Sequence, residues 1–273
     1  MFEFSIHGTR GTMPACGAEY LGYGGNTTCF SIRSEKGWLI VDAGSGIKHV
    51  SNKINHSNFS LPLAIIFTHF HIDHIIGLPS FEPLYKKKTN LCLYGSKENN
   101  PLWKDHLKIF MANPFWPVGL GEAPANASLS DLPPSANSMD IFGIHVTWFN
   151  VPHPQKCLLY RIDADGRSII IATDTEFENA DSASDDFMAM CKKADYLLMD
   201  AQFTPSEYLL HKGWGHSSWE TAANVAKKCC VRNLILIHHA PDRSDAELQR
   251  IQSDARQIFP STTAAIETMS WKL

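Results

Sequence analysis

Short apolar runs separated by glycine and polar turns recur along the chain, and they predict strands more often than helices. Residues 28–34 and 37–44 predict a hairpin, and the continuous apolar run at 63–69 is typical of a strand buried on both faces. Further strands are expected at 90–94, 144–150, 157–162, 168–173, 196–200, 233–237 and 264–269. Predicted strands therefore outnumber predicted helices.

Helix signals lie mostly in the second half of the chain. Ser217 and Glu220 form one capping-box pattern, and Ser244 and Glu247 form another, each before an amphipathic run. The stretch 121–138 is rich in proline, serine, alanine and asparagine, but strand patterns continue on both sides of it. We therefore expect a single domain over residues 1–273, with a cap or lid insertion at about 100–138.

Composition excludes several classes of protein. The 273 residues carry a net charge of −4, which does not favour a protein that coats nucleic acid or an anionic membrane. The seven cysteines contain no CxxC pair, so neither a zinc finger nor a disulfide framework is expected. We find no signal-peptide pattern and no apolar run of about 18 residues, so we expect a cytoplasmic protein without a membrane partner.

The segment THFHIDH, residues 68–74, concentrates potential metal ligands directly after a predicted buried strand. It holds His69, His71, Asp73 and His74. Imidazole nitrogens and carboxylate oxygens are ligands of borderline divalent metals such as zinc. In an extended segment residues 69 and 71 point the same way, while 73 and 74 turn away from them. One loop could thus serve two neighbouring metal ions.

Similar side chains follow three other predicted strands. His153 comes after the run 144–150, Asp174 after 168–173 and His238 after 233–237. The segment THFHIDH, followed by a later histidine, an aspartate in a DT turn and a final histidine, resembles the metallo-β-lactamase superfamily. The resemblance covers almost the whole chain.

This resemblance implies an α/β (α+β) fold, the four-layer αβ/βα sandwich, with a dinuclear metal site at one edge. By position, the implied ligands of the first metal are His69, His71 and His153, those of the second are Asp73, His74 and His238, and Asp174 bridges the two. We expect two divalent ions per chain, zinc first, with manganese or iron as alternatives. His239, next to His238, is more consistent with a packing or supporting role, and Asp42 is expected to support the metal loop without binding metal.

Within the superfamily, the segment 194–203 followed by 215–239 is similar to ribonuclease Z. In that family a carboxylate after a strand steadies a histidine just before a helix, and the matching residues here are Asp200 and His216. Met199 stands where the family usually has a histidine. The resemblance implies that Asp73 orients the attacking water and that His216 acts as general acid, with Asp200 holding it.

Two segments are candidates for contact with substrate. The glycine-rich stretch before the first hairpin contains Asn26 and Thr27, which either bring backbone amides close to the site or form only a tight turn. Phe115 and Trp116, in the aromatic segment 100–125, either stack on a nucleobase or bury against the domain or a second subunit.

These features rank the possible functions. A lactonase or a thioesterase shares the histidine motif but is not expected to carry the Asp200 and His216 pair. The acidic charge, and the absence from the sequence of a long insertion rich in glycine and lysine, disfavour tRNA 3′-end cleavage. We therefore predict hydrolysis of a small phosphodiester, most plausibly a 3′,5′-cyclic nucleotide, by a homodimer. Cleavage of pre-tRNA is the runner-up.

Overall fold

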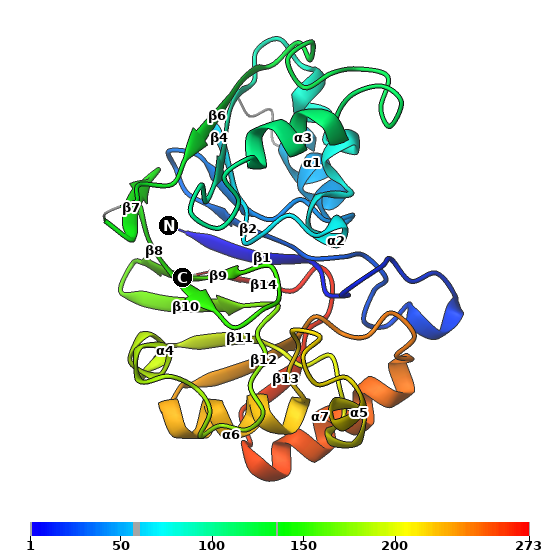
Figure 1. Cartoon of the computed structure of the whole chain (residues 1–273), viewed down its shortest axis with the longest axis vertical. Helices are drawn as coiled ribbons and strands as arrows, with labels where there is room; N and C mark the ends of the chain where they lie inside the picture. The colour runs from blue at the N-terminus through cyan, green and yellow to red at the C-terminus, as the bar shows by residue number, and fades with distance from the viewer. Residues whose placement is uncertain (1, 57–60, 135, 273) are drawn as a thin grey trace.

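The computed structural model describes residues 2–56, 61–134 and 136–272, and within them two seven-stranded sheets lie face to face (Figure 1). The order in the first sheet is β14-β1-β2-β3-β4-β5-β6. Its strands are β1 (Glu3–Gly8), β2 (Cys29–Arg33), β3 (Trp38–Val41), β4 (Leu63–Ile66), β5 (Asn90–Gly95), β6 (Asn126–Asp131) and β14 (Ser270–Lys272). The first sheet is antiparallel from β14 to β3 and parallel from β3 to β6.

The second sheet has the order β13-β12-β11-β10-β9-β8-β7. Its strands are β7 (Ser138–Ile141), β8 (Ile144–Val151), β9 (Cys157–Ala164), β10 (Arg167–Ala172), β11 (Tyr196–Asp200), β12 (Asn233–Ile237) and β13 (Thr262–Ala264). The strands from β10 to β13 pair in parallel, and those from β7 to β10 pair antiparallel. The carboxyl ends of parallel strands in both sheets meet at one edge of the sandwich, where loops can carry functional side chains.

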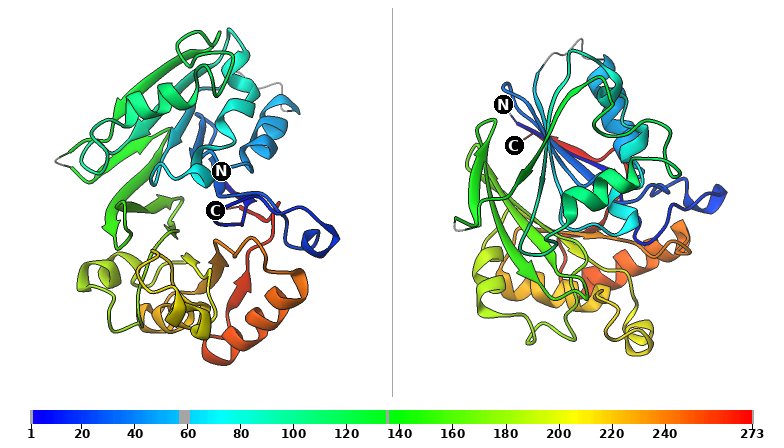
Figure 2. Two further views of the ribbon diagram at one scale, coloured as in Figure 1. Left: turned by 45° about the vertical axis from the view of Figure 1, so that its right-hand side comes forward. Right: turned by 45° about the horizontal axis from the view of Figure 1, so that its top comes forward.

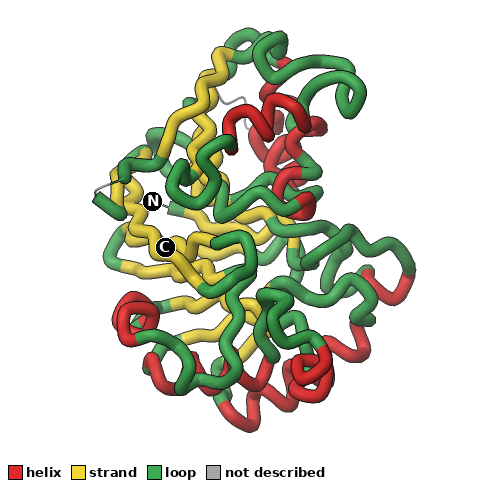
Figure 3. Tube along the Cα trace, in the orientation of Figure 1, coloured by secondary structure: helices red, strands yellow, loops and turns green. Residues whose placement is uncertain are grey.

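Helices cover the outer face of each sheet, as Figures 1 and 3 show. The first sheet carries α1 (Ile47–His56), α2 (Ile72–Ile75) and α3 (Trp103–Phe110), and the second carries α4 (Asp185–Cys191), α6 (Trp219–Cys229) and α7 (Asp245–Ile258). A short helix, α5 (Pro205–Leu210), follows β11. Figure 2 shows the same layers from two further directions.

Three apolar clusters hold these layers together. The central cluster joins side chains from the inner faces of both sheets, such as Phe30 and Val41 from the first and Tyr160 and Ile171 from the second. The other two fill the spaces between each sheet and its helices. Burial of apolar surface of this kind is worth about 25 cal/mol per Å². The predicted four-layer sandwich is confirmed.

The predicted hairpin and most predicted strands are also confirmed, but the strand expected at 264–269 is wrong. Thr262–Ala264 forms β13 in the second sheet, and Ser270–Lys272 forms β14 in the first. The chain crosses between the two sheets here, and the backbone N–H of Thr268 donates to the carbonyl oxygen of Ile6. An apolar run alone does not show at which residue a chain leaves one sheet for the other.

One of the two predicted capping boxes is wrong. Ser244 and Glu247 do form a reciprocal box at the start of α7. The residue that caps α6, however, is Ser218, whose side chain accepts from the N–H of Thr221. Ser217 instead accepts a hydrogen bond from the N–H of Phe177 and donates one to the carbonyl oxygen of residue 175. Serine at two successive positions allowed either to be the cap.

The segment 100–138 contains more regular structure than its composition indicates. Trp103, at the start of α3, is fully buried against the first sheet, and its indole N–H donates to Asp131. Residues 126–131 pair in parallel with β5 and form the edge strand β6. The structure thus places these parts of the segment in the sandwich itself. Closure of the remaining loop over a ligand stays a prediction.

Candidate metal centre

The loops at the carboxyl ends of four strands bring the predicted ligands together. The loop after β4 and the first turn of α2 supply four of them, and single residues follow β8, β10 and β12. The residues gathered in this way are His69, His71, Asp73, His74, His153, Asp174 and His238. Parallel strands end at the same edge, so residues far apart in sequence meet there.

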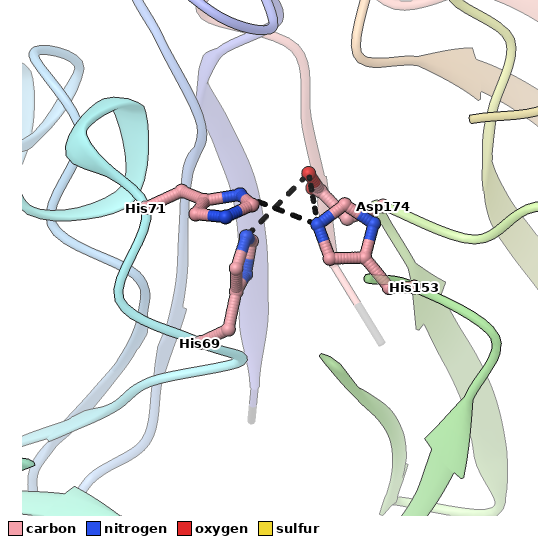
Figure 4. Close-up of side chains that lie close together, drawn as sticks. All are labelled: His69, His71, His153 and Asp174. Carbon is pink, nitrogen blue, oxygen red and sulfur yellow. Dashed lines mark hydrogen bonds and ion pairs between the residues drawn. The ribbon is translucent and has the colours of Figure 1, made fainter. Parts of the chain in front are cut away.

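The first cluster consists of three histidines and one carboxylate, drawn in Figure 4. His71 Nδ1 lies 3.2 Å from His153 Nε2. Asp174 Oδ1 lies 3.6 Å from His69 Nε2 and 3.9 Å from His153 Nε2. Neighbouring ligands in a tetrahedral zinc site with bonds of about 2.05 Å are about 3.3 Å apart. These side chains therefore surround a space of the right size for a metal ion.

The second cluster uses the other oxygen of the same carboxylate. Asp174 Oδ2 lies 3.0 Å from His74 Nε2 and 3.3 Å from His238 Nε2. Asp73 Oδ2 lies 3.4 Å and 3.2 Å from the same two nitrogens. Because each cluster faces one oxygen of Asp174, this carboxylate is placed to bridge two ions.

Two nitrogens in these clusters have no hydrogen-bond partner. His69 Nε2 and His74 Nε2 are buried, and neither makes a hydrogen bond in the described part of the chain. A buried polar atom without a partner costs about 1–3 kcal/mol. A divalent ion would satisfy both atoms, because each points into its own cluster with lone pairs from several neighbours. The donor set and its geometry therefore fit two metal ions.

Buried partners hold the ligand histidines in place. Asp42 accepts from His74 Nδ1 at 2.8 Å and from the N–H and the hydroxyl of Thr68 at 2.8 Å each. Gln202 Oε1 accepts from His238 Nδ1 at 2.9 Å. Such partners fix the tautomer of a histidine and leave its other nitrogen free for a metal. The supporting position expected for Asp42 is the one that the structure shows.

His153 and Asp73 are held by backbone groups instead. His153 Nδ1 donates to the carbonyl oxygen of Gly215 at 3.0 Å, and the N–H of Thr12 donates to Asp73 Oδ2 at 2.8 Å. Sequence analysis missed Gly215 and Thr12 as well as Gln202. Gly11, just before Thr12, lets the backbone approach the centre closely, because a Cβ built on it would lie 2.2 Å from the ring of His238.

Three residues of this centre have a left-handed backbone. The φ angles of Asp42, Asp174 and His238 are 60°, 50° and 59°. Residues other than glycine rarely adopt this region, although aspartate and histidine tolerate it better than most. Conformations of this kind cost about 1–3 kcal/mol each and cluster at functional sites.

Charge and burial oppose each other in the centre. Burial lowers the pKa of His69 well below its usual range, and repulsion from His74 lowers it further. Burial would also lower the pKa of His238, but Asp174, Asp73 and Asp200 together raise it to about 9. The carboxylates thus favour positive charge in a buried space. A divalent cation would supply that charge without protonation of the histidines.

His216 and Asp200 lie beside the second cluster. His216 Nδ1 donates to Asp200 Oδ2 at 2.8 Å, and the His216 ring stacks on that of His238 with 4.8 Å between centroids. Asp200 is fully buried and also accepts from the N–H groups of Gln202 and Ser217, each at 3.2 Å. These contacts fix the His216 ring with Nε2 free.

His239 differs from its neighbour. Its Nε2 donates to the carbonyl oxygen of Ala265 at 3.1 Å, and burial together with the charge of Arg10 lowers its pKa to about 3. It belongs to none of the metal-type clusters found among the described residues. His239 is therefore a neutral packing residue that joins the loop after β12 to the loop before β14.

A cavity of about 520 Å³ opens over the second cluster. Its lining includes site residues and a set of side chains from the segment between β11 and α7. The residues of that second set are Gln202, Phe203, Glu207, His211, Trp214, Ala240, Pro241, Asp242 and Arg243. The cavity gives a ligand access to His71, Asp73, His216 and His238.

The residues expected to contact substrate are not among those that line this cavity. Asn26 is bonded to Glu267 and Ser45, and Thr27 accepts from the N–H of Ser45, so both hold a turn. The Trp116 indole donates to Tyr85. The Phe115 side chain is 67% exposed. The structure does not bring these four residues to the metal clusters.

Comparisons with known proteins agree with this fold. The sequence is 24% identical to ribonuclease Z of Oceanobacillus iheyensis over 84% of this chain and 87% of that protein. It is also 24% identical to ribonuclease Z of Exiguobacterium sibiricum over 94% of both chains.

Solved structures show the same architecture at lower identity. The metallo-β-lactamase fold protein YhfI from Bacillus subtilis matches over the full length of both chains with a TM-score of 0.75 and 17% identity. A diphosphatase of the PhnP family matches over 100% of this chain and 98% of that one, with a TM-score of 0.72 and 16% identity. Unliganded yeast PDE1 matches over 100% and 99%, with a TM-score of 0.69 and 16% identity.

A family model gives the assignment. The model described as the beta-lactamase superfamily domain matches residues 37–239, which include all seven residues of the two clusters. This span is well over half of the 273 residues. The chain therefore belongs to the beta-lactamase superfamily and has the metallo-β-lactamase fold.

Proposed function

We propose that the protein hydrolyses a phosphodiester at a two-metal centre. The observation that carries the proposal is that two ligand clusters share Asp174 next to His216, which a buried carboxylate holds with one nitrogen free. Ribonuclease Z relatives, and fold neighbours that include a diphosphatase and PDE1, support phosphoryl chemistry over lactone or thioester hydrolysis.

The position of each residue indicates its role in the proposed reaction. The two clusters would hold two divalent ions, zinc first, which when bound would supply Lewis acidity and lower the pKa of water toward neutrality. Asp73 faces the cavity with one oxygen held by the Thr12 N–H, so it can orient the attacking water. His216 also faces the cavity, and its Nε2 can protonate the departing oxygen while Asp200 stabilises the resulting imidazolium.

For the substrate we propose a small phosphodiester, with a 3′,5′-cyclic nucleotide as the first choice. The cavity of about 520 Å³ is in the range typical of sites for small molecules. The net charge of −4 does not favour a long contact with an RNA backbone. Cleavage of the 3′ end of pre-tRNA is the second candidate, because the sequence relatives compared above are named ribonuclease Z.

A side-by-side assay of the zinc-loaded and manganese-loaded protein tests this proposal. The panel contains cyclic mononucleotides, cyclic dinucleotides, a phosphoribose cyclic phosphate and a pre-tRNA, with an acyl-homoserine lactone and a glutathione thioester as controls. We expect turnover of a small phosphodiester. Cleavage of pre-tRNA alone, weakening steeply with salt, would select the second candidate, and turnover of only the lactone or the thioester would reject phosphodiester chemistry.

We also propose that the protein is a homodimer. Exposed apolar side chains on two loops and on α5 support this, since Met13, Leu21, Leu209 and Leu210 are 50–81% exposed. Exposed apolar side chains mark an interface where they form one patch, and we propose that these four form the subunit contact. Sedimentation at micromolar concentration checks it, and a monomer throughout would contradict it.

No helix in the described ranges is long and apolar enough to cross a membrane.

A further inference from the structure

Trp214 is a large aromatic residue held at the edge of the cavity. Its side chain is 62% exposed, yet it lines the same cavity as His71, Asp73 and His216. Exposed tryptophan is costly to hydrate, and a single indole beside a reacting centre is typical of a surface on which a ring stacks. The position of Trp214 therefore needs an explanation from function.

A dedicated turn holds this residue. Gly213 and Gly215, on either side of Trp214, have φ angles of 89° and 94°. The backbone N–H of each glycine donates to the carboxylate of Glu176 at 2.7 Å, one to each oxygen. Tyr208 donates to the same carboxylate at 3.3 Å. The turn is thus fixed by one acidic side chain rather than left free.

The same turn is tied to the metal centre. The carbonyl oxygen of Gly215 accepts from His153 Nδ1 at 3.0 Å, and His153 belongs to the first cluster. Trp214 is therefore one residue away from a group that touches a ligand histidine. The turn that carries Trp214 is thus bonded to the metal centre as well as to Glu176.

Aromatic rings continue from Trp214 to His216. The Trp214 ring meets His211 edge-on, with centroids 4.7 Å apart and planes at 86°. His211 stacks on Phe203 at 4.8 Å and 14°, and Phe203 meets His216 edge-on at 6.0 Å. All four line the cavity. We call Phe203, His211 and Trp214 the aromatic wall.

Polar groups lie in the same cavity beside this wall. Arg243 is 9% exposed and pairs with Glu207, and its Nε is buried without a hydrogen-bond partner in the described part of the chain. Glu207 Oε2 takes both this contact and the N–H of Thr204. The cavity thus has one side lined by the aromatic wall and another that carries donor and acceptor groups. This combination suits a heterocyclic base better than an alkyl chain.

We propose that the aromatic wall, with Trp214 as its main contact, binds the nucleobase of the substrate while the metal clusters hold the phosphodiester. This inference rests on the proposed function and narrows it to phosphodiesters that carry a nucleoside. It assigns stacking to Trp214, which His211 supports edge-on, and not to Phe115 and Trp116, which lie outside the cavity lining.

Three chromogenic esters with the same leaving group provide the test. Thymidine and adenosine 5′-(4-nitrophenyl phosphate) carry a base, and methyl 4-nitrophenyl phosphate does not. Stacking is worth about 1–3 kcal/mol per base, so Trp214→Ala should raise KM for the nucleoside esters by about 5- to 150-fold. The methyl ester should change by less than about twofold, and Trp214→Phe should recover most of the loss.

The matched control is Lys212→Ala. Lys212 is exposed, lies two residues before Trp214 and pairs with the exposed Glu178, and it does not line the cavity. We expect it to leave both KM values unchanged. An equal effect of Trp214→Ala on the methyl ester and the nucleoside esters, or no effect on either, would overturn the proposal. A change in sedimentation with KM unaltered would also overturn it, by making Trp214 a subunit contact.

Direct binding separates this inference from the proposed function. Equilibrium dialysis of the metal-loaded protein against adenosine 5′-phosphate and ribose 5-phosphate needs no turnover. Weaker binding of the adenosine ligand alone in Trp214→Ala supports the aromatic wall even if neither ester is hydrolysed. Equal weakening of both ligands, or of neither, rejects it whatever the activity.

Discussion

His238 and His239 are adjacent buried histidines with opposite chemical settings. His238 Nε2 faces two carboxylates, whereas His239 Nε2 donates to a backbone carbonyl group. We therefore expect His238→Ala to lower the metal content from about two ions per chain to about one, and His239→Gln to leave it unchanged. Elemental analysis after metal repletion and desalting measures both.

The pair is its own control, because both side chains are 1% exposed and both variants disturb the same loop. Any general loss of structure would lower the metal content of both. Full metal content in His238→Ala would show that this residue is not a ligand, and the second cluster would then lack the histidine contributed by the second sheet.

Substitution of His216 should affect the chemical step without affecting metal binding. His216 contacts Asp200 through Nδ1, and no described contact uses its Nε2. His216→Ala should keep both metals and lose about 10²–10⁴ in kcat on an alkyl ester, because general acid catalysis contributes about that much. With a nitrophenolate leaving group the loss should shrink, since no proton is needed. Steady-state kinetics on both esters decide it, and an equal loss on both would refute the role of acid.

The seven residues of the two clusters were predictable from the sequence, but the groups that hold them were not. Spacing within residues 68–74 and the ends of predicted strands named all seven residues that the structure gathers. Gln202, Thr12 and Gly215 carry no such pattern, because two of their contacts use backbone atoms and the third depends on how β11 and β12 lie side by side. Such contacts come from tertiary structure alone.

At the scale of elements, the turn at 213–215 offers a comparison of two glycines. Both have positive φ angles, and both donate to Glu176. A Cβ on Gly215 would lie 2.2 Å from His153 Nδ1, whereas a Cβ on Gly213 would meet nothing within 4 Å. Each substitution by alanine should cost about 1–2 kcal/mol of unfolding free energy from backbone strain.

Only Gly215→Ala should also disturb the metal. Loss of an orienting partner weakens metal affinity by about 10- to 100-fold, and that loss is expected for Gly215→Ala but not for Gly213→Ala. Competition with a metal indicator measures affinity, and denaturant unfolding measures stability. The same affinity in both variants would show that the Gly215 carbonyl group does not position His153.

Strands were predictable from the sequence where a buried apolar run was the only signal. Buried apolar runs predicted β11 and β12 residue for residue, and they predicted β4 with three residues too many at its carboxyl end. The edge strand β6 was missed because its residues alternate between small and polar side chains and read as a loop. Between β13 and β14 the chain passes from one sheet to the other inside one apolar run. Where it does so depends on the pairing of β13 with β12 and of β14 with β1, and not on the residues of the run itself.

At the scale of the whole molecule, the metal centre joins the two halves of the sandwich. His69, His71, Asp73 and His74 come from the first sheet and α2, and His153, Asp174 and His238 follow strands of the second. Removing the ions should therefore destabilise the whole domain. With ions at about 100 times their dissociation constant, the loss is about 2.7 kcal/mol per site.

Thermal unfolding with and without a chelator measures this effect. We expect a lower Tm in the chelator for the natural chain and a much smaller difference for Asp174→Asn, which lacks the shared carboxylate. Hydrogen exchange should rise in strands of both sheets, since the ions bridge them. A rise confined to the loop at 68–76 would show that the metals order only that loop.

The left-handed backbone at Asp42, Asp174 and His238 also limits how these positions can vary. A side chain branched at Cβ is strained in this conformation, whatever its chemistry, while asparagine and glycine tolerate the conformation. A deep mutational scan should therefore show two different outcomes at each position. Asparagine should give folded but inactive chains, and valine or isoleucine should give a loss of soluble protein. The three positions are constrained by geometry before selection for activity applies.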